Sequence, residues 1–445
     1  MRKSFLILLS AGLVWAESPL TLEQCRKLAG ENNADLVQAR LETESAEQTR
    51  KAAFVNFFPQ ITAGAVAMAA KDPLVNIKTQ GGNLPVFDGN PANLANATQF
   101  AYMPGGGMSM ADKANVLLVS AVQPVFAGGR VVNGNRLAAL GVEIARDKEE
   151  MARRDAVGKA EDKYWQLLAL AEKRRTLDAY DSLLAALERR VRDAKASGVV
   201  SNNDLLKVAL KRSEARVDRG RLESGMRLSA RDLRRHLGIA DDTILTLADS
   251  LAVPEDPAAW VAEGDGALDR RVELHLLDRA VRAEELQSDM KRGEMLPTLS
   301  VGANWLRTDV GGMGASSNAV VFAMASVPVT EIWSGAHHLA GQKAKARIAQ
   351  VRLADTKRLV AMGVAKDWDD LATAYRTVLV SDEAVAQAEA NLKDEDERHR
   401  AGVSTISELL EAQVLLQQAR GGRIDARVAY WSAREGWRRS VASRR

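Results

Sequence analysis

Two carboxylates near the C-terminus have a spacing that could concentrate negative charge. Glu408 and Glu411 are three residues apart, so on a helix they share one face. The same region also reads as helix capping, because Thr405-x-x-Glu408 has the form of a capping box. Ser201-x-x-Asp204 repeats that form 204 residues earlier. In this second interpretation Glu408 caps its helix and Glu411 is a solvated surface residue. Both roles are compatible, because a capping carboxylate still adds its negative charge to that face of the helix.

The remaining reactive side chains form no recognisable catalytic or metal site. The five histidines lack ligand spacing with cysteines or carboxylates: His236, His275, His337, His338 and His399. A single cysteine, Cys25, excludes a disulfide framework, and we expect it to be a buried helix residue. The glycine clusters are not followed by the Lys-Ser/Thr of a phosphate loop, and Gly-x-Ser-x-Gly is missing. The sequence therefore predicts no enzyme, no metal and no cofactor.

The composition favours very long helices. The chain has 445 residues, of which 46% are hydrophobic and 27% charged, with a net charge of +3. A charge so close to balance does not indicate a nucleic-acid-binding protein. None of the 11 prolines lies in 125–253 or 329–445. Because proline breaks helix interiors, we expect these two stretches to be largely helical.

The N-terminus has the form of an export signal. Arg2 and Lys3 precede the apolar stretch Phe5–Val14, and a small-x-small site places cleavage after Ala16. An anchor helix is the alternative, but ten apolar residues are too few to span a bilayer. We therefore expect a signal peptide at 1–16. No later apolar run approaches 18 residues, so only a closed β-barrel could place this chain in a membrane.

The mature chain contains an internal repeat. Residues 33–65 match 271–303 at a constant offset of 238, and Gly198-Val199 matches Gly402-Val403 at an offset of 204. The offset falls because the first copy carries an insert near 71–112, which is either a functional loop or partly ordered. We expect repeat 1 over 17–237, an inter-repeat segment over 238–267 and repeat 2 over 268–445.

Each repeat predicts a helix, two strands, a very long helix, a tight turn and a returning helix. The expected helices are 22–56, 130–196 and 203–236 in repeat 1, and 268–294, 337–400 and 406–440 in repeat 2. A seam with 3,4 spacing supports the first long helix: Leu177, Tyr180, Leu184, Leu187 and Val191. The expected strands are about 59–70, 115–125, 297–306 and 319–329, close to the length of membrane β-strands. Four strands cannot close a barrel, so we expect an oligomer that pools them.

This arrangement resembles the TolC-type outer-membrane efflux family (outer membrane factors). The resemblance rests on the doubled unit, the Gly-Val turns, Leu20-Thr21-Leu22-Glu23-Gln24, Phe58-Pro59 and Leu237-Gly238-Ile239. It implies an α+β membrane protein: a homotrimer whose 12-stranded β-barrel, four strands per chain, continues into a long periplasmic α-helical barrel. The inter-repeat segment would belong to an equatorial region around that helical barrel.

The same resemblance implies a function and a set of partners. It implies an exit duct of a tripartite efflux or type I secretion system in the Gram-negative outer membrane, surrounded by outer-membrane lipid. A periplasmic adaptor protein would connect the duct to an inner-membrane transporter, which supplies the energy. Drug, metal-ion and protein cargo all fit such a duct.

Site residues follow from the resemblance in two groups. In a trimer Glu408 and Glu411 would form two rings of like charge at the periplasmic aperture, favouring cations and raising some carboxylate pKa values. The family latches this aperture with an Arg and a Tyr, where this chain has Ser404 and His399; Asp204 matches a tether partner. We therefore expect a different latch. The hairpin tips Ser197, Gly198 and Val199, and Ala401, Gly402 and Val403, would dock the adaptor.

Two other interpretations compete. A periplasmic coiled-coil adaptor or structural envelope protein would also be rich in long helices. An adaptor carries one helical hairpin rather than two copies of strand pairs and hairpins, however. A periplasmic α+β enzyme would need a catalytic constellation that the sequence lacks.

Overall fold

The computed structural model describes residues 19–73, 75–87, 89–110, 112–240, 245–258, 260, 271–311 and 314–441. The expected signal peptide lies outside these residues, as do 241–244, 259 and 261–267 of the inter-repeat segment. The chain divides into two compact units, which are described separately. One comprises Met1–Glu47, Leu140–Arg282 and Arg347–Arg445, and the other comprises Gln48–Ala139 and Ala283–Ala346.

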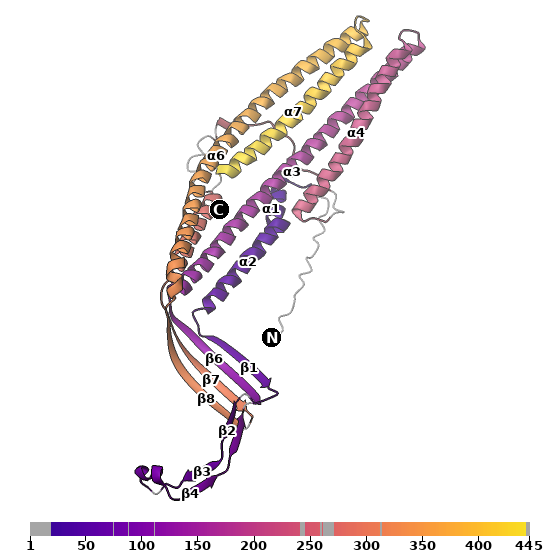
Figure 1. Ribbon diagram of the computed structural model, residues 1–445. Coiled ribbons are helices and arrows are strands. Elements are labelled where there is room, and N and C mark those ends of the chain that lie inside the picture. Colours follow the sequence, from indigo (N-terminus) through magenta and orange to yellow (C-terminus); the bar gives the residue numbers. More distant parts are fainter. Residues whose placement is uncertain are drawn as a thin grey trace. The chain divides into compact units, whose positions relative to one another are not determined.

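Long helices dominate the chain (Figure 1). Two are very long, and each is followed by a shorter antiparallel helix after a tight turn. The first pair is α3 (Arg130–Ala196) with α4 (Asn202–Leu237), and the second is α6 (Val329–Arg400) with α7 (Ile406–Val441). The other helices are α1 (Leu22–Asn32), α2 (Ala34–Val55) and α5 (Val272–Glu294). Two helical hairpins per chain confirm the expected duplication.

The seam predicted on α3 is the core of the helical unit near the hairpin turns. Leu184 and Leu187 are almost completely buried, and they pack with Val208 of α4 and with Leu409 and Leu410 of α7. The apolar residues recur every three or four positions, so they form one stripe that a neighbouring helix can cover. This core therefore joins the two hairpins to each other.

The first helix is broken, whereas the sequence predicts one continuous helix over 22–56. Asn33 takes an extended backbone conformation between α1 and α2. Its side-chain oxygen accepts from the backbone N–H groups of Asp35 (3.0 Å) and Leu36 (3.4 Å), so it caps α2. Its side-chain nitrogen donates to the carbonyl of His236 (3.0 Å). An asparagine that satisfies backbone groups in this way ends one helix and starts the next.

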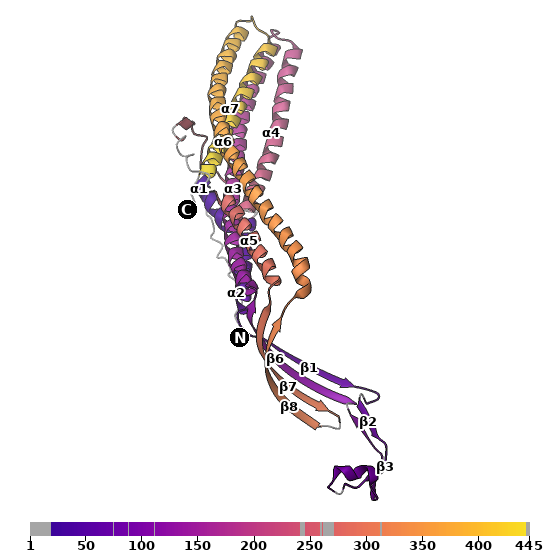
Figure 2. The same ribbon diagram turned by 60° about the vertical axis from the view of Figure 1, so that its left-hand side comes forward.

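Four long antiparallel strands form the main sheet of the second unit (Figure 2). They are β1 (Gln60–Ala69), β6 (Lys113–Ala127), β7 (Thr298–Val310) and β8 (Gly314–Ser326), in the order β1-β6-β7-β8. The register places Ala63 opposite Val119, Val119 opposite Trp305, and Trp305 opposite Ala319. Strands from both repeats thus share one sheet, as the fold class requires.

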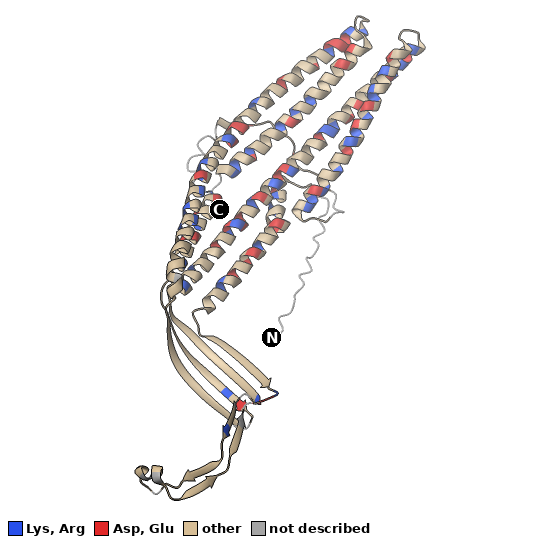
Figure 3. Cartoon of the chain, in the orientation of Figure 1, with Lys and Arg blue, Asp and Glu red and all other residues tan. Residues whose placement is uncertain are grey.

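The main sheet has little charge and much exposed apolar surface. Figure 3 shows almost no charged residues along β1 and β6–β8, whereas the helices are covered with both signs. On β7 the apolar side chains Leu299, Val301 and Trp305 are exposed, while the alternating Ser300 and Asn304 are half-buried. The alternation follows the sequence itself, in which apolar and polar or small residues alternate from Leu299 to Trp305. No helix in the described part of the chain is long and apolar enough to cross a membrane.

The insert of the first repeat is partly ordered, one of the two alternatives that the sequence left open. It holds two small antiparallel ladders, of β2 (Val75–Thr79) with β5 (Gly106–Met110) and of β3 (Gly82–Pro85) with β4 (Phe100–Met103). A short 3-10 helix, η1 (Pro91–Asn96), lies between β3 and β4.

Candidate functional site

The two hairpin turns have the same backbone geometry. Gly198 and Gly402 both have φ of 76°, a left-handed conformation that glycine adopts at little cost. In each turn the following residue donates back to the long helix: Val199 N–H to the Ala194 carbonyl (2.9 Å), and Val403 N–H to the Arg398 carbonyl (3.0 Å). These bonds satisfy carbonyls at the helix ends and fix the turns.

The valines at the two tips point into solvent. Val199 is 76% exposed and Val403 is 69% exposed. Both apolar side chains are therefore accessible to a partner at the tips. The flanking tip residues, Ser197 and Ala401, are also exposed.

Glu408 caps α7, as the second interpretation of its spacing predicted. Its Oε2 accepts from the Thr405 backbone N–H (2.7 Å) and lies 3.0 Å from Thr405 Oγ1, while its own N–H donates to Thr405 Oγ1 (3.3 Å). The Thr405 backbone N–H, followed by the hydroxyls of Thr405 and Ser404, lowers the pKa of the Glu408 carboxyl. Glu411, one turn further along α7, is exposed.

Ser404 and His399 contact each other at the second hairpin. His399 Nδ1 lies 3.1 Å from the Ser404 carbonyl, an arrangement in which the imidazole donates. The Ser404 hydroxyl lies 2.6 Å from a carboxylate oxygen of Glu395 and 3.1 Å from Glu408. Four side chains from α6, the turn and α7 thus form one hydrogen-bonded cluster, so the two positions that depart from the family pattern are tied within their own hairpin.

Asp204 plays the matching part at the first hairpin. Its carboxylate accepts from the Ser201 hydroxyl (2.7 Å) and the Ser201 backbone N–H (3.3 Å), which completes the capping box of α4. Asp204 therefore lies near the tip of the first hairpin (α3 and α4), whereas His399 and Ser404 belong to the second hairpin (α6 and α7). Lys207 Nζ lies 4.0 Å from Asp204.

Polar contacts between the two hairpins come from residues that the sequence analysis did not select. Lys207 Nζ of α4 donates to the Ser407 hydroxyl of α7 (2.8 Å), and Arg190 of α3 lies 3.5 Å from Asp396 of α6. One signal was available, because Lys207 stands where the repeat places Glu411. The other residues carry no motif.

A second group of charges is buried further along the helical unit. Arg26 of α1 pairs with Glu161 of α3 and Glu435 of α7, both at 2.6 Å. Glu161 also binds Arg439 of α7. The two carboxylate side chains are only 4% and 5% exposed. Burial raises the pKa of Glu161, against the opposing effect of the two arginines. This network joins three helices from distant parts of the sequence.

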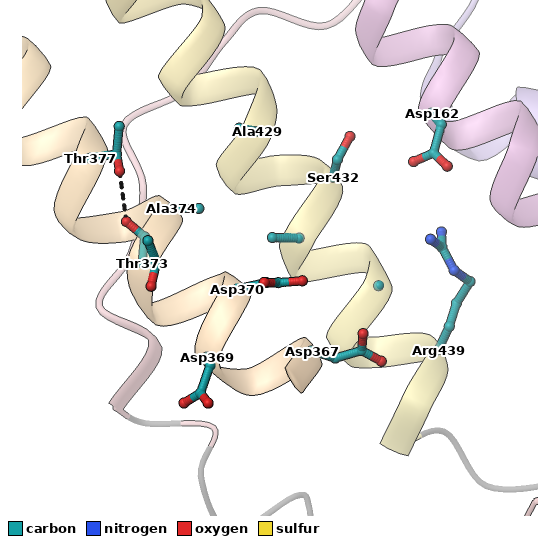
Figure 4. A pocket seen from close by; sticks show the side chains of 12 residues that line it. Asp162, Asp367, Asp369, Asp370, Thr373, Ala374, Thr377, Ala429, Ser432 and Arg439 are labelled. Carbon is teal, nitrogen blue, oxygen red and sulfur yellow. Dashed lines mark hydrogen bonds between the residues drawn. The ribbon is translucent and has the colours of Figure 1, made fainter. Parts of the chain in front are cut away.

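An acidic hollow of about 630 Å³ lies between α3, α6 and α7 (Figure 4). Asp367, Asp369 and Asp370 of α6 line it, together with Asp162 of α3 and Arg439 of α7. Burial raises the pKa of Asp367, and Asp370 is paired with Lys366. Within the described ranges no group of three or more His, Cys, Asp or Glu is placed to hold a metal ion.

One family model matches most of the chain. The family model described as "Outer membrane efflux protein" matches residues 26–238 and 265–442. No curated protein matches the chain at a significant level. Solved structures do, at low identity.

Three of these structures show the same fold. VceC of Vibrio cholerae is 13% identical with a TM-score of 0.74, over 95% of this chain and 96% of VceC. The CmeC outer membrane channel of Campylobacter jejuni is 13% identical with a TM-score of 0.72, over 94% and 85% of the two chains. The open state of the MtrE outer membrane channel of Neisseria gonorrhoeae is 14% identical with a TM-score of 0.73, over 94% and 88%.

The family match covers both repeats, and the fold is the one that the sequence predicted: long helices, four long strands and an internal duplication. The chain therefore belongs to the outer membrane efflux protein family, and it is a non-enzymatic efflux channel of the outer membrane with a periplasmic helical part.

Proposed function

We propose that three copies of this chain form the exit duct of a tripartite efflux or secretion system. Family membership implies a trimer that works in an efflux complex. The observation that carries the proposal for this chain is the open sheet: β1 and β8 each have a neighbour on one side only within the described strands. Unpaired strand edges are not tolerated in lipid, so the edges of neighbouring copies must pair. Three copies of four strands give a 12-stranded barrel.

The exposed apolar face of the sheet supports this placement. Leu299 and Val301 are 45% and 44% exposed on β7, and Val321 of β8 is 84% exposed. Apolar side chains on the outside of a barrel face outer-membrane lipid, where they are stable.

The two hairpin tips are the proposed docking surface for a periplasmic adaptor, which would connect the duct to an inner-membrane transporter. Their support is the matched geometry of Gly198 and Gly402 and the exposure of Val199 and Val403. An adaptor would cover both valines and recover the free energy of burying them.

Glu411 and Glu408 are the proposed charges of the periplasmic aperture. Three copies would bring six carboxylates around one axis and favour cations. Because Glu408 also caps α7, its orientation is fixed, whereas exposed Glu411 is free to face the lumen. Asp204, Ser404 and His399 hold the tips beside this aperture, in place of the family's usual latch.

Envelope fractionation tests the duct, and a substitution tests the docking. The purified protein should run as a trimer on an unheated gel and as a monomer after heating, and it should fractionate with the outer membrane. A soluble monomer would reject the duct. Val199→Asp with Val403→Asp should abolish efflux in cells and leave the trimer intact. Val253→Asp, at a residue 74% exposed outside the tips, is the matched control. Efflux that survives the tip changes would reject the docking surface.

A further inference from the structure

The insert between β1 and β6 leaves the main sheet at the end away from the helices. β1 begins five residues after α2, and β6 ends three residues before α3, so both strands meet the helices at their other ends. Ala69 pairs with Lys113, and the Ala70 N–H donates to the Asp112 carbonyl (2.7 Å). Both ends of the insert therefore lie side by side at the outer end of the sheet.

The insert is strongly apolar and almost free of charge. In the sequence, residues 79–110 contain a single charged residue, Asp88. Its exposed large apolar side chains are Ile77, Leu84, Val86, Phe87, Leu94, Phe100, Tyr102, Met103 and Met108. A patch of this kind on a soluble surface marks a contact site. A two-stranded ladder is also only marginally stable alone in water, so a partner that covers the insert would stabilise it.

In the inner ladder the register separates an apolar from a polar face, whereas the outer ladder carries exposed apolar side chains on both faces. Ile77 pairs with Met108 on one face of the inner ladder, whereas Asn76 and Lys78 lie on the other face. In the outer ladder Phe100 and Tyr102 lie on the same face and are 57% and 71% exposed. Aromatic residues and methionine are enriched in protein–protein interfaces and charges are depleted there, which matches this surface.

We propose that the insert of each chain packs against the inserts of the two other chains and forms an apolar constriction at the outer end of the barrel. The proposal rests on the trimer proposed above. Closure of the barrel holds three identical inserts around one axis, where their effective concentration is high. The near absence of charge removes the repulsion that identical copies would otherwise suffer. Hydrophobic constrictions can gate a channel by excluding water.

The structure provides a natural place to remove the outer part of the insert. Gly81 and Gly105 approach so closely that a Cβ on Gly81 would overlap the Gly105 backbone. Thr79 and Gly106 pair beside them, and the Thr79 hydroxyl donates to the Gly106 carbonyl (2.8 Å). Deleting 82–104 and joining Gly81 to Gly105 leaves the short turn Gln80-Gly81-Gly105, which glycine favours. The inner ladder is retained.

Cysteine cross-linking tests the contact. The native Cys25 is buried, and burial raises its pKa to about 12. The unmodified protein should therefore form no disulfide cross-link and is the negative control. In dilute detergent-solubilised trimers, Tyr102→Cys should give a disulfide-linked dimer on a denaturing gel after oxidation. Asn76→Cys, on the polar face of the inner ladder, should give far less. If the insert lies on lipid instead, Tyr102→Cys stays unlinked and reacts with a membrane-soluble maleimide, which overturns the proposal.

Single-channel recording tests the constriction. The 82–104 deletion should raise conductance in planar bilayers on the order of two-fold or more, because an apolar narrowing has been removed. The deletion variant must still run as a trimer on an unheated gel. A trimeric variant with the conductance of the unmodified channel overturns the constriction and leaves the duct standing. Failure of the unmodified protein itself to form a trimer would instead reject the duct.

Discussion

The ammonium group of Lys207 lies 2.8 Å from the hydroxyl of Ser407, and so joins the first helical hairpin to the second close to their turns. The repeat would place a carboxylate at this position of α4, because Glu411 is the mate of Lys207. Three carboxylates from α4 would add to the charge of α7, whereas lysine instead forms a bond between the hairpins. A change in the relative position of α4 and α7 must break this bond.

Lys207→Met should therefore favour the open aperture. We expect a higher open probability in planar bilayers and little change in melting temperature, because exposed polar pairs contribute little to stability. Lys211→Met is the matched control, since Lys211 pairs with Glu214 within α4 (2.8 Å). Equal behaviour of the two variants would show that the Lys207–Ser407 bond does not hold the hairpins.

Neutralising the proposed aperture charges should reduce cation selectivity. Glu411→Gln removes an exposed carboxylate and should lower the cation-to-anion permeability ratio, read from the reversal potential in a salt gradient. Glu408→Gln should act in the same direction, and its amide can still accept from Thr405 and cap α7. Glu383→Gln, on α6, is the control. A reversal potential unchanged in both variants would place these carboxylates outside the lumen.

Breaking the buried network around Arg26 should be strongly destabilising. Arg26→Met leaves Glu161 and Glu435 buried with fewer partners, and loss of one partner from a buried pair costs about 3–5 kcal/mol. Arg40→Met is the control, because its pair with Glu149 is 3.6 Å long and more exposed. Chemical denaturation of the two variants gives the comparison. A loss no larger than that of the control would contradict the role assigned to Arg26.

The same network predicts how the free energy of unfolding changes with pH. The pKa of Glu161 is raised in the folded chain, so between its ordinary and its raised pKa the folded state binds more protons than the unfolded state. This group therefore favours the folded state more as the pH falls through that window. Without Arg26 the pKa of Glu161 rises further, so this pH window widens. The loss of unfolding free energy in Arg26→Met should therefore become smaller as the pH falls through the window. Glu161→Gln in the Arg26→Met background should remove that pH dependence.

Replacing a turn glycine and replacing a helix glycine by alanine should change the free energy of unfolding in opposite directions. Gly402→Ala forces a side chain into a φ of 76° and should cost about 1–2 kcal/mol. Gly220→Ala, at an exposed position in the interior of α4 where a Cβ meets no atom within 4 Å, should gain up to about 1 kcal/mol. Thermal unfolding of both variants checks the pair. Stabilisation by Gly402→Ala would mean that the turn does not need the left-handed conformation.

The sequence alone determined the repeated architecture of this protein. The seam from Leu177 to Val191 and the absence of proline identified the long helices, because helix periodicity and proline are local properties. The capping boxes at Asp204 and Glu408 were legible for the same reason, since each involves residues three positions apart. The alternation on β7 indicated a sheet with one apolar face.

Only the tertiary structure decided how distant segments meet. Arg26, Glu161 and Glu435 carry no motif and lie more than 100 residues apart, so their buried network follows from the packing of α1, α3 and α7. Asn33 caps α2 through local bonds, whereas the bond from its side-chain nitrogen to the carbonyl of His236 joins residues more than 200 positions apart. The bond between Lys207 and Ser407 and the approach of Gly81 to Gly105 have the same origin. Local patterns fix which elements form, whereas contacts between them depend on the three-dimensional path of the chain.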